Sequence, residues 1–389
     1  MTEIVNSTIL SSTKRKRGSN IVFTSGCYDI LHAGHVQFFR EARALGDYLV
    51  VCFASKEVLL QHKGRISALP DEHKKALMEE LECVDECVIG NVGTLGLDFE
   101  ESFLEIKPQI LAVTDDDRYM DIKLKLCSKI DCKYIKLPKT PPEFGVISTT
   151  DIRRTIAAPI EVPLRIDFAG GWLDVPRFAR KGGHIVNVAI SPLVSLSEWS
   201  YHKRSGLGGS GAIALLRGED GIASEVVDLG VGWQDPAIIS ETGLCVWRSG
   251  DLPSLEFKSD GEFLKGKMAI FFTGSSHDTP NLADLDRDFD LIYEAGEVAT
   301  KAVRNDNLIE LAEAVEISYK MQMKEGMNEL IIPKEMLTEE ALKEGKILAR
   351  KYAGGGFGGY SVYLCSSQET RDRLCTLTDF RPVEPFIRL

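Results

Sequence analysis

The sequence has no run of about 18 apolar residues, the length at which a stretch becomes a candidate transmembrane helix. Residues 1–20 are polar and lack the apolar core of a secretory signal, so we expect a chain that is not secreted and works in the cytoplasm. Basic residues are in the minority, with 46 Lys and Arg against 58 Asp and Glu, and the formal net charge is −12. This balance argues against a general nucleic-acid binder. We therefore expect neither nucleic acid nor a membrane among the partners.

Cysteine is also scarce, with nine in the whole chain. That number is too small for a disulfide scaffold, and an odd count leaves at least one thiol unpaired. The two closest pairs, Cys83 with Cys87 and Cys127 with Cys132, lack CxxC spacing, and no suitably placed histidine completes a zinc set. We predict buried or free thiols and assign no metal to cysteine.

The length and composition are those of a globular protein with more than one domain. A chain of 389 residues fits two or three domains, and 44% apolar with 27% charged residues are ordinary proportions. Residues 1–19 are predicted to be a disordered leader, and their basic cluster at 14–17 leaves a nuclear-import address as the less favoured alternative. Ala157, Ala158 and Pro159 form a plausible linker, so the predicted domains are residues 20–157 and 158–389.

The first half alternates apolar β-type runs with helical patterns. Helices are predicted to begin near Gly34, at Pro70 and at the hydroxyl cluster of Ser148, Thr149 and Thr150, which would cap the last of them. This alternation predicts a Rossmann-like parallel sheet with right-handed crossovers and ligands at the carboxyl ends of its strands. The predicted strands are 21–24, 48–53, 84–89, 110–113 and 134–137.

The string GCYDILHAGH, residues 26–35, follows the first predicted strand and opens the first predicted helix. It places His32 and His35 at a helix N-terminus, which is an anion site. Gly34 between them lets the backbone approach a phosphate closely. Cationic imidazoles at this place suit nucleotidyl transfer, in which charge builds on the α-phosphate of a nucleotide as pyrophosphate leaves.

With this string and three others in order, residues 20–157 resemble the cytidylyltransferase family of HxGH nucleotidyltransferases, especially the domain that makes nucleotide-activated heptose. The other strings are Lys63-Gly64-Arg65, Asp115 to Tyr119 and Ile147 to Thr150. The resemblance implies that His32 and His35 bind the triphosphate and stabilise the transition state, and that Lys63 holds phosphate. It also implies nucleotide contacts from Gly26, Cys27, Tyr28, Gly34, Ser148, Thr149 and Thr150. His73 departs from the arginine usual in the family, so that basic contact would be weaker or would come from Lys74.

The second half has a different set of glycine-rich strings. RIDFAGGWLDVP spans residues 165–176, SGLGGSGA spans 205–212 and AGGGFGG spans 353–359. SGLGGSGA precedes an apolar helix start, and it is not a Walker loop because no GK[ST] follows. Its glycines free backbone N–H groups to hold phosphate oxygens, and Ser210 is placed to reach a bound Mg²⁺. These glycines (Gly206, Gly208, Gly209 and Gly211) show no evident packing purpose, which favours a working phosphate loop.

Together the three strings resemble the GHMP kinase family, small-molecule kinases with their own phosphate loop, in the form found in heptose-phosphate and fucose kinases. The resemblance implies that Arg165 lies near the transferred phosphoryl group, that Asp174 binds sugar hydroxyls and that Asp235 of GWQDP is the catalytic aspartate. It places Gly355 and Gly356 beside the phosphate loop and the substrate. It also suggests that Asp278 and Thr279 line the acceptor pocket.

One segment departs from the kinase pattern. The family usually has a helix pair between the phosphate loop and the catalytic aspartate, with a glutamate that helps to hold Mg²⁺. Only residues 213–234 separate the two here, and Glu219 and Glu225 are the acids that remain to replace that glutamate. The sequence does not choose between them.

The sequence therefore predicts an α/β protein, with a Rossmann-like nucleotidyltransferase domain followed by an α+β GHMP-kinase-like domain. The leading hypothesis is a bifunctional enzyme that phosphorylates a sugar, heptose-like by resemblance, with ATP and joins the sugar phosphate to a nucleotide from CTP or ATP, with Mg²⁺ as cofactor. One alternative is a nucleotidyltransferase alone, acting on glycerol phosphate or another phosphorylated acceptor beside a degenerate kinase domain. Another is a nucleotide-sugar sensor without turnover. A homo-oligomer is one option for its assembly.

Overall fold

A computed structural model describes residues 17–276, 285–332, 346–377 and 379–388. The chain divides into two compact units, Met1–Arg153 and Arg154–Leu389, and each is described here by itself. Of the predicted leader only residues 17–19 are described. Asp278 and Thr279, suggested above for the acceptor pocket, lie outside the described residues.

The first unit is built on a five-stranded sheet in which every strand pair is parallel. The strand order is β3-β2-β1-β4-β5, so the chain reverses its direction of travel between β1 and β4. All five predicted strands are present, with ends that shift by one or two residues. They are β1 (Ile21–Gly26), β2 (Tyr48–Ala54), β3 (Glu86–Gly90), β4 (Ile110–Thr114) and β5 (Lys133–Leu137).

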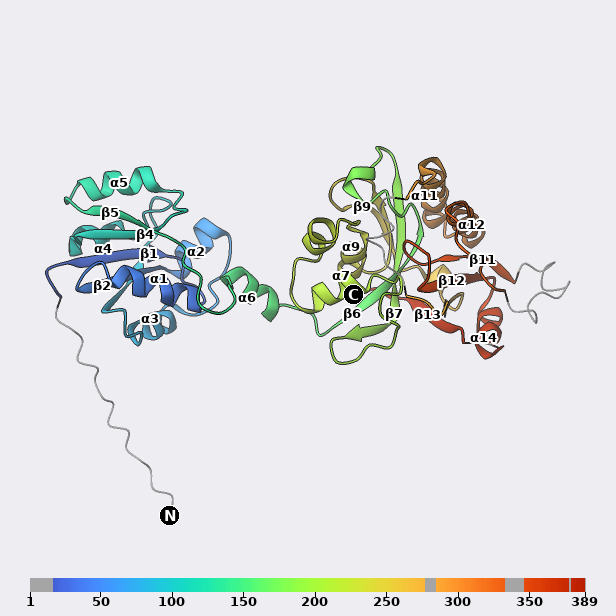
Figure 1. The fold of residues 1–389 in the computed structure, drawn as a ribbon, viewed down its shortest axis with the longest axis horizontal. Helices are drawn as coiled ribbons and strands as arrows, with labels where there is room; N and C mark the ends of the chain where they lie inside the picture. The colour runs from blue at the N-terminus through green and yellow to red at the C-terminus, as the bar shows by residue number, and fades with distance from the viewer. Residues whose placement is uncertain (1–16, 277–284, 333–345, 378, 389) are drawn as a thin grey trace, which may run out of the picture. The chain divides into compact units, whose positions relative to one another are not determined.

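Both faces of this sheet are buried, which explains the continuous apolar runs of its central strands. In β1, Val22 packs on one face with Phe39 of α1, while Phe23 points to the other face. There the Phe23 ring lies 5.6 Å from the ring of Phe99 and 5.4 Å from that of Phe103. Helices α1 and α3 lie on the first side of the sheet and α4 and α5 on the second (Figure 1).

The three predicted helices are confirmed, and three more are present that the sequence reasoning did not identify. Two of the predicted helices are equally short, but each begins at a start signal in the sequence, Pro70 or the hydroxyl cluster. The predicted ones are α1 (Ala33–Arg43), α3 (Asp71–Glu79) and α6 (Thr149–Ile156), and the others are α2 (Lys56–Lys63), α4 (Glu100–Ile106) and α5 (Met120–Ser128).

The second unit has an antiparallel sheet of eight strands in the order β11-β12-β10-β13-β7-β8-β9, with β6 paired to β7. Antiparallel pairing confirms the predicted change of architecture, from an α/β first half to an α+β second half. The strands are β6 (Glu161–Ala169), β7 (His184–Ser195), β8 (Leu244–Arg248), β9 (Ser254–Ser259), β10 (Met268–Phe272), β11 (Ile347–Tyr352), β12 (Tyr360–Cys365) and β13 (Arg381–Pro385).

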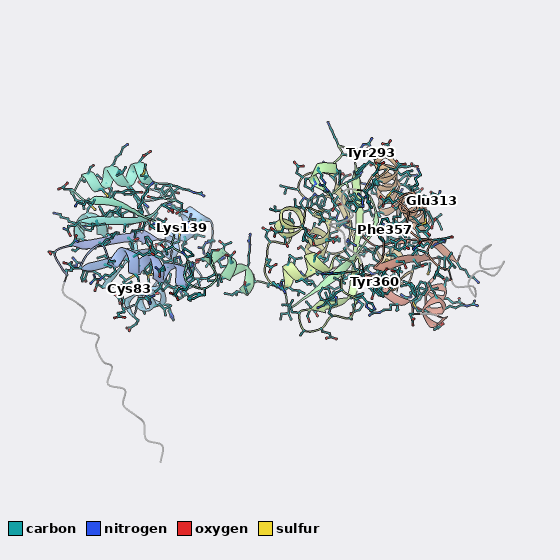
Figure 2. The ribbon with its side chains drawn as sticks, in the orientation of Figure 1. Cys83, Lys139, Tyr293, Glu313, Phe357 and Tyr360 are labelled. Carbon is teal, nitrogen blue, oxygen red and sulfur yellow. The ribbon has the colours of Figure 1, made fainter. Side chains whose placement is uncertain are left out.

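Helices cover both sides of the β6–β7 region, with α7 and α9 on one side and α11 and α12 on the other (Figure 1). The core between these layers is dense, and Tyr360 of β12 lies inside it with 1% of its surface exposed (Figure 2). The helices are α7 (Gly209–Leu216), α8 (Gly221–Ala223), α9 (Gln234–Glu241), α11 (Phe289–Arg304), α12 (Leu308–Lys324) and α14 (Gln368–Leu377), with short turns η1 (Pro176–Phe178), η2 (Ser224–Asp228) and η3 (Glu262–Leu264).

Two further features bear on the sequence analysis. Within the described parts of the chain, no helix has the length and apolar character needed to cross a bilayer. All nine cysteines are free thiols.

The packing of Phe23 leads to a stability prediction for the first unit. We expect Phe23→Ala to lower the free energy of unfolding of this unit by about 3–5 kcal/mol, because it leaves a cavity against two aromatic rings. All four tryptophans (Trp172, Trp199, Trp233 and Trp247) belong to the second unit, so tryptophan fluorescence follows that unit alone. The loss should appear in the circular dichroism melt and leave the fluorescence transition in place.

Phe144→Ala removes the same atoms from a side chain that is 67% exposed, and it serves as the matched control. Equal destabilisation by the two substitutions would contradict the packing described for β1.

Candidate functional site

His32 and His35 lie at the start of α1, at the carboxyl end of β1. His32 is the N-cap residue of the helix, and the two imidazole rings stack with their centroids 3.7 Å apart. Gly34 makes this possible, because a Cβ there would lie 3.2 Å from the His32 ring. The Nδ1 atoms of both histidines are buried without a hydrogen-bond partner in the described structure. Two ring nitrogens therefore lie at a helix N-terminus where an anion is favoured.

The charge state of this pair differs from the one expected. Burial lowers the pKa of His32, although the nearby Asp151 carboxylate opposes the effect. Burial, with a contribution from the charge of His32, lowers the pKa of His35 to about 4. Burial therefore opposes the expected positive charge on both imidazoles, most strongly on His35. At neutral pH the His35 ring is neutral, and a neutral imidazole still carries one N–H that can donate to an oxygen.

A residue between β1 and α1, Tyr28, packs against the histidine pair. Tyr28 has a positive φ of 40° and is 6% exposed, and its ring packs edge-on to His35 at 5.1 Å. Gly26 leaves room for it, since a Cβ at Gly26 would come within 2.6 Å of the Tyr28 ring. Any nucleotide contact that Gly26 and Tyr28 make is therefore a backbone contact. The Tyr28 side chain packs against His35.

The Lys63-Gly64-Arg65 string ends α2 and turns toward β1. Gly64 adopts a left-handed φ of 62° that closes the helix. Arg65 then pairs with the fully buried Asp29, which also accepts hydrogen bonds from Ser67 Oγ at 2.8 Å and from the Ala68 N–H. Lys63 is exposed. Burial raises the pKa of the Cys27 thiol, and the positive charge of Lys63 lowers it again in part. Lys63 and Cys27 are therefore close to the end of β1.

The hydroxyl cluster of α6 comes to the same end of the sheet. Ser148 Oγ accepts from the Asp151 N–H at 3.2 Å, which confirms it as a helix cap. Thr149 Oγ1 donates to the backbone carbonyl of Ile30 at 3.4 Å, and Asp151 acts electrostatically on His32. Thr150 is exposed on the next position. The structure therefore brings the hydroxyl cluster and the histidine pair together, although they are more than a hundred residues apart in sequence.

Lys74 does not take over from the missing arginine at His73. It is 1% exposed, forms an ion pair with Asp71 at 2.8 Å and donates to the Ala54 carbonyl at 2.9 Å. Its ammonium group also lies 4.8 Å from the centre of the Phe53 ring. Every one of these contacts is internal, so the expectation that Lys74 supplies a nucleotide contact is wrong.

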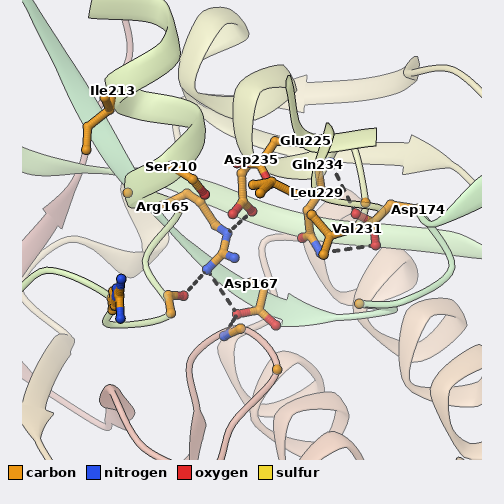
Figure 3. Close-up of a pocket in the computed structure, with 18 of the residues that line it drawn as sticks. Arg165, Asp167, Asp174, Ser210, Ile213, Glu225, Leu229, Val231, Gln234 and Asp235 are labelled. Carbon is orange, nitrogen blue, oxygen red and sulfur yellow. Dashed lines mark hydrogen bonds and ion pairs between the residues drawn. The ribbon is translucent and has the colours of Figure 1, made fainter. Parts of the chain in front are cut away.

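The second unit contains a pocket of about 480 Å³ that joins the predicted kinase strings (Figure 3). At its centre Arg165 of β6 donates from Nε to Asp235 Oδ1 of α9 at 2.7 Å. Arg165 also donates to the Gly206 carbonyl and lies 3.5 Å from Asp167 Oδ1. The arginine and the aspartate that the sequence placed in one site are thus in direct contact.

The predicted phosphate loop forms one wall of this pocket and opens α7. Gly206 and Gly208 have positive φ values of 76° and 80°. Gly208, Gly209 and Ser210 line the pocket, with the helix N-terminus directed at it. Gly206 packs against the Ala353 carbonyl, and a Cβ at Gly211 would lie 3.0 Å from Pro236. The view that these glycines lack a packing purpose is therefore wrong: two of them permit close backbone approach.

Two buried carboxyl groups lie beyond the arginine. Asp174 is 2% exposed and accepts from Trp172 N at 3.0 Å and from Gln234 Nε2 at 3.1 Å, and burial raises its pKa to about 6. Glu225 of η2 is 3% exposed, and its Oε1 is buried without a partner in the described structure. Burial and then the charge of Asp235 raise the pKa of Glu225 to about 7, an effect that the Ser210 hydroxyl opposes.

The structure therefore selects Glu225 over Glu219, which is exposed. An unpartnered carboxylate oxygen beside Ser210 and Asp235 fits a cation that is also bound to phosphate, since Mg²⁺ takes only one or two carboxylates in such sites. Within the described residues, no group of three or more His, Cys, Asp or Glu side chains forms a metal site.

Only some glycines of the third string, AGGGFGG, line the pocket. Gly354 and Gly355 line the pocket, and a Cβ at Gly354 would lie 3.0 Å from the Gly206 carbonyl oxygen, so this turn packs beside the phosphate loop. Gly356 does not line the pocket. A Cβ there would overlap the sulfur of Met327, so its role is in packing.

Several pocket residues escaped the sequence reasoning. Asp167 was within the quoted string, two residues after Arg165, and alternation along a strand would have put both on one face. Gln234, next to the predicted Asp235, had the same kind of signal. Trp172 also stood within the quoted string, whereas other lining residues, among them Trp199, His202, Lys203 and Arg204, carry no local pattern.

Comparisons with known proteins agree with the geometry of the first unit. The family model described as cytidylyltransferase-like matches residues 23–155. An FAD synthase of Thermococcus onnurineus is 38% identical over 112 residues, which are 29% of this chain and 73% of that protein. The bifunctional protein HldE of Pelobacter propionicus is 38% identical over 109 residues, which are 28% of this chain and 22% of that protein.

Among solved structures, a mevalonate kinase is similar at a TM-score of 0.42 and 13% identity, over 58% of this chain and 98% of that one. The family model covers the parallel sheet, both histidines of the α1 start and the hydroxyl cluster of α6. Through this unit, the chain belongs to the cytidylyltransferase-like family of nucleotidyltransferases.

Proposed function

We propose that the chain is a sugar-activating enzyme with two activities. The second unit phosphorylates a sugar with ATP, and the first transfers a nucleotidyl group from CTP or ATP to the sugar phosphate, with release of pyrophosphate. One observation carries this proposal. Each unit sets reactive side chains beside a helix N-terminus that favours phosphate: His32 and His35 at α1, and Arg165 with Asp235 at α7.

In the first unit, an oxygen of the sugar phosphate attacks the α-phosphorus of the nucleotide. The bond to the bridging oxygen breaks, and pyrophosphate leaves with that electron pair. His32 and His35 would donate N–H groups to the oxygens on which negative charge grows, as neutral rings. The N-terminus of α6, with Ser148 and Thr149, would hold the triphosphate from the other side.

In the second unit, Asp235 would orient the sugar hydroxyl and accept its proton as the oxygen attacks the γ-phosphorus of ATP. Arg165, held on Asp235 and on the Gly206 carbonyl, would stabilise charge on the transferred phosphoryl group. The α7 N-terminus binds the remaining phosphates, and Asp174 with Gln234 would contact the sugar. Ser210 and Glu225 would hold Mg²⁺, which supplies neutralising charge for the phosphates when bound.

The named relatives define the competing function. HldE carries the name of a bifunctional protein, and the match covers 22% of its length. FAD synthase, which matches over a similar share of this chain, carries a name that indicates FAD as the product instead. The decisive experiment incubates the full chain with Mg²⁺ and ATP or CTP against a panel of sugars, sugar phosphates, glycerol phosphate and FMN. Mass detection of a nucleotide-sugar from an unphosphorylated sugar supports the proposal, whereas FAD as the sole product would replace it.

The neutral histidines predict a pH dependence for the transferase. Because the free enzyme needs no imidazolium, kcat/KM for pyrophosphate release should not fall between about pH 6 and pH 8, where an ordinary histidine with a pKa near 6.5 loses its proton. His35→Ala should lower the rate by about 10²–10⁴-fold. The measurement is coupled pyrophosphate release across this range.

His184→Ala is the control, because His184 bonds to Glu256 and Glu297 in the other unit and should leave the rate unchanged. A decline of kcat/KM centred near pH 6.5 would show that a charged imidazole is required.

The Arg165–Asp235 contact predicts a separation of the two activities. We expect Asp235→Asn to lower sugar phosphorylation by about 10²–10⁴-fold, since the amide cannot accept the hydroxyl proton. Pyrophosphate release from a supplied sugar phosphate should stay as in the wild type. Asp228→Asn, at an exposed carboxylate of η2, is the matched control. Full phosphorylation by Asp235→Asn would remove Asp235 from the mechanism.

The raised pKa of Glu225 predicts how magnesium dependence varies with pH. A metal ligand must be deprotonated, so the half-saturating Mg²⁺ concentration for phosphorylation should rise about tenfold from pH 8 to pH 6, through the pKa of about 7. Glu225→Gln should raise it at both pH values and abolish the dependence. Glu219→Gln, at an exposed position between α7 and α8, should match the wild type. An equal effect of the two substitutions would exclude Glu225 as the ligand.

A further inference from the structure

Lys351 is a lysine buried behind the pocket of the second unit. It belongs to β11, is 3% exposed and is not among the residues that line the pocket. Its ammonium group donates to Asp167 Oδ2 at 2.6 Å. Removing an ammonium from water is costly unless an opposite charge and hydrogen bonds replace the solvent. The role of Asp167 should therefore explain why a charged lysine is buried here.

Asp167 is the junction between three segments that are distant in sequence. Its Oδ1 accepts from the backbone N–H of Gly354 at 2.8 Å and lies 3.5 Å from Arg165 NH1, while Oδ2 accepts from Lys351. The carboxylate is 2% exposed, so no solvent shares its charge. Figure 3 shows it below Arg165, on the side of the guanidinium away from Asp235.

Arg165 thus lies between two carboxylates that compete for it. Its Nε donates to Asp235 at 2.7 Å, whereas its NH1 is 3.5 Å from Asp167, beyond an ordinary N–H to O distance for a charged pair. NH1 donates instead to the Gly206 carbonyl of the phosphate loop. The arrangement favours Asp235, although Asp167 is the more deeply buried acid and would otherwise attract the guanidinium more strongly.

We propose that Lys351 is a positioning residue for phosphoryl transfer: by neutralising Asp167, it leaves the Arg165 guanidinium directed at Asp235 and the phosphate loop. This inference rests on the kinase activity proposed above. Lys351 touches neither substrate nor nucleotide, and it acts through Asp167 alone. The four side chains then form a buried row of alternating charge, Lys351, Asp167, Arg165 and Asp235.

The test uses the full chain and three variants. In Lys351→Met the unpaired Asp167 should draw Arg165 away from Asp235, and kcat for phosphorylation should fall by about 100-fold or more while KM for ATP stays within about threefold. In the double variant with Asp167→Asn the competing charge is gone, so at least about tenfold of that loss should return. Lys258→Met is the matched control, because Lys258 pairs with Glu241 on a partly exposed surface of the same unit.

A purely structural role for Lys351 makes a different prediction. The variants would then lose melting temperature, while each folded molecule would keep the wild-type kcat. The proposal is overturned if Lys351→Met retains the wild-type kcat per folded molecule. It is also overturned if the double variant turns over no faster than Lys351→Met.

A spectroscopic measurement makes the inference independent of turnover. The Nε–H resonance of Arg165, assigned by its loss in Arg165→Lys, should report the hydrogen bond to Asp235 and shift in Asp235→Asn. In Lys351→Met it should shift toward its Asp235→Asn position and exchange faster with water, and in the double variant it should return. An unshifted resonance in Lys351→Met would overturn the proposal. If the wild type phosphorylates no sugar, the proposed function fails while this measurement still decides the role of Lys351.

Discussion

The pocket of the second unit depends on the ion pair between Arg165 and Asp235. It joins the strand that carries the first kinase string to the helix that carries the predicted catalytic aspartate, and both groups are largely removed from water. Buried charges of this kind are stable only in compensated sets, because each desolvated ion is costly by itself. Lys351 and Asp167 extend the set on one side, and Glu225 and Asp174 approach it on the other. The kinase-like chemistry proposed for this unit follows from that arrangement.

In the first unit, the proposed phosphate site uses neutral groups. Its histidine pair is stacked and partly buried, and desolvation lowers the pKa of both rings, that of His35 to about 4. In the proposed mechanism, the attraction for phosphate comes from oriented N–H groups and from two helix N-termini, α1 and α6. Of the formal positive charges near this end of the sheet, Arg65 and Arg153 pair with Asp29, and Lys63 is exposed. The two proposed phosphate sites thus rely on different chemical groups.

Much of the fold could be predicted because the period of apolar residues is a local property. The five parallel strands were visible in runs such as 48–53, and the start of α6 was visible in the capping hydroxyls at 148–150. Arg165 and Asp235 were each placed in the kinase site because each was part of a distinct motif, and the structure shows that they pair. Helices α2, α4 and α5 were missed because the sequence reasoning found no start signal for them, whereas α3 and α6, of similar length, begin at Pro70 and at the hydroxyl cluster. Lys74 was misjudged because its sequence neighbours do not reveal that Asp71 and the Ala54 carbonyl enclose it.

The sequence by itself determined the order of the two architectures, the motifs and the chemical types of the side chains that carry the proposed chemistry. Those depend on local patterns of apolarity, glycine and hydroxyl residues. Only the tertiary structure decided that Glu225 and not Glu219 lies beside the phosphate loop. It also decided that Lys74 is enclosed by internal contacts, that Lys351 pairs with Asp167, and that burial lowers the pKa of the two histidines. Each of these depends on burial and on partners up to 184 residues away along the chain, and no local pattern records desolvation.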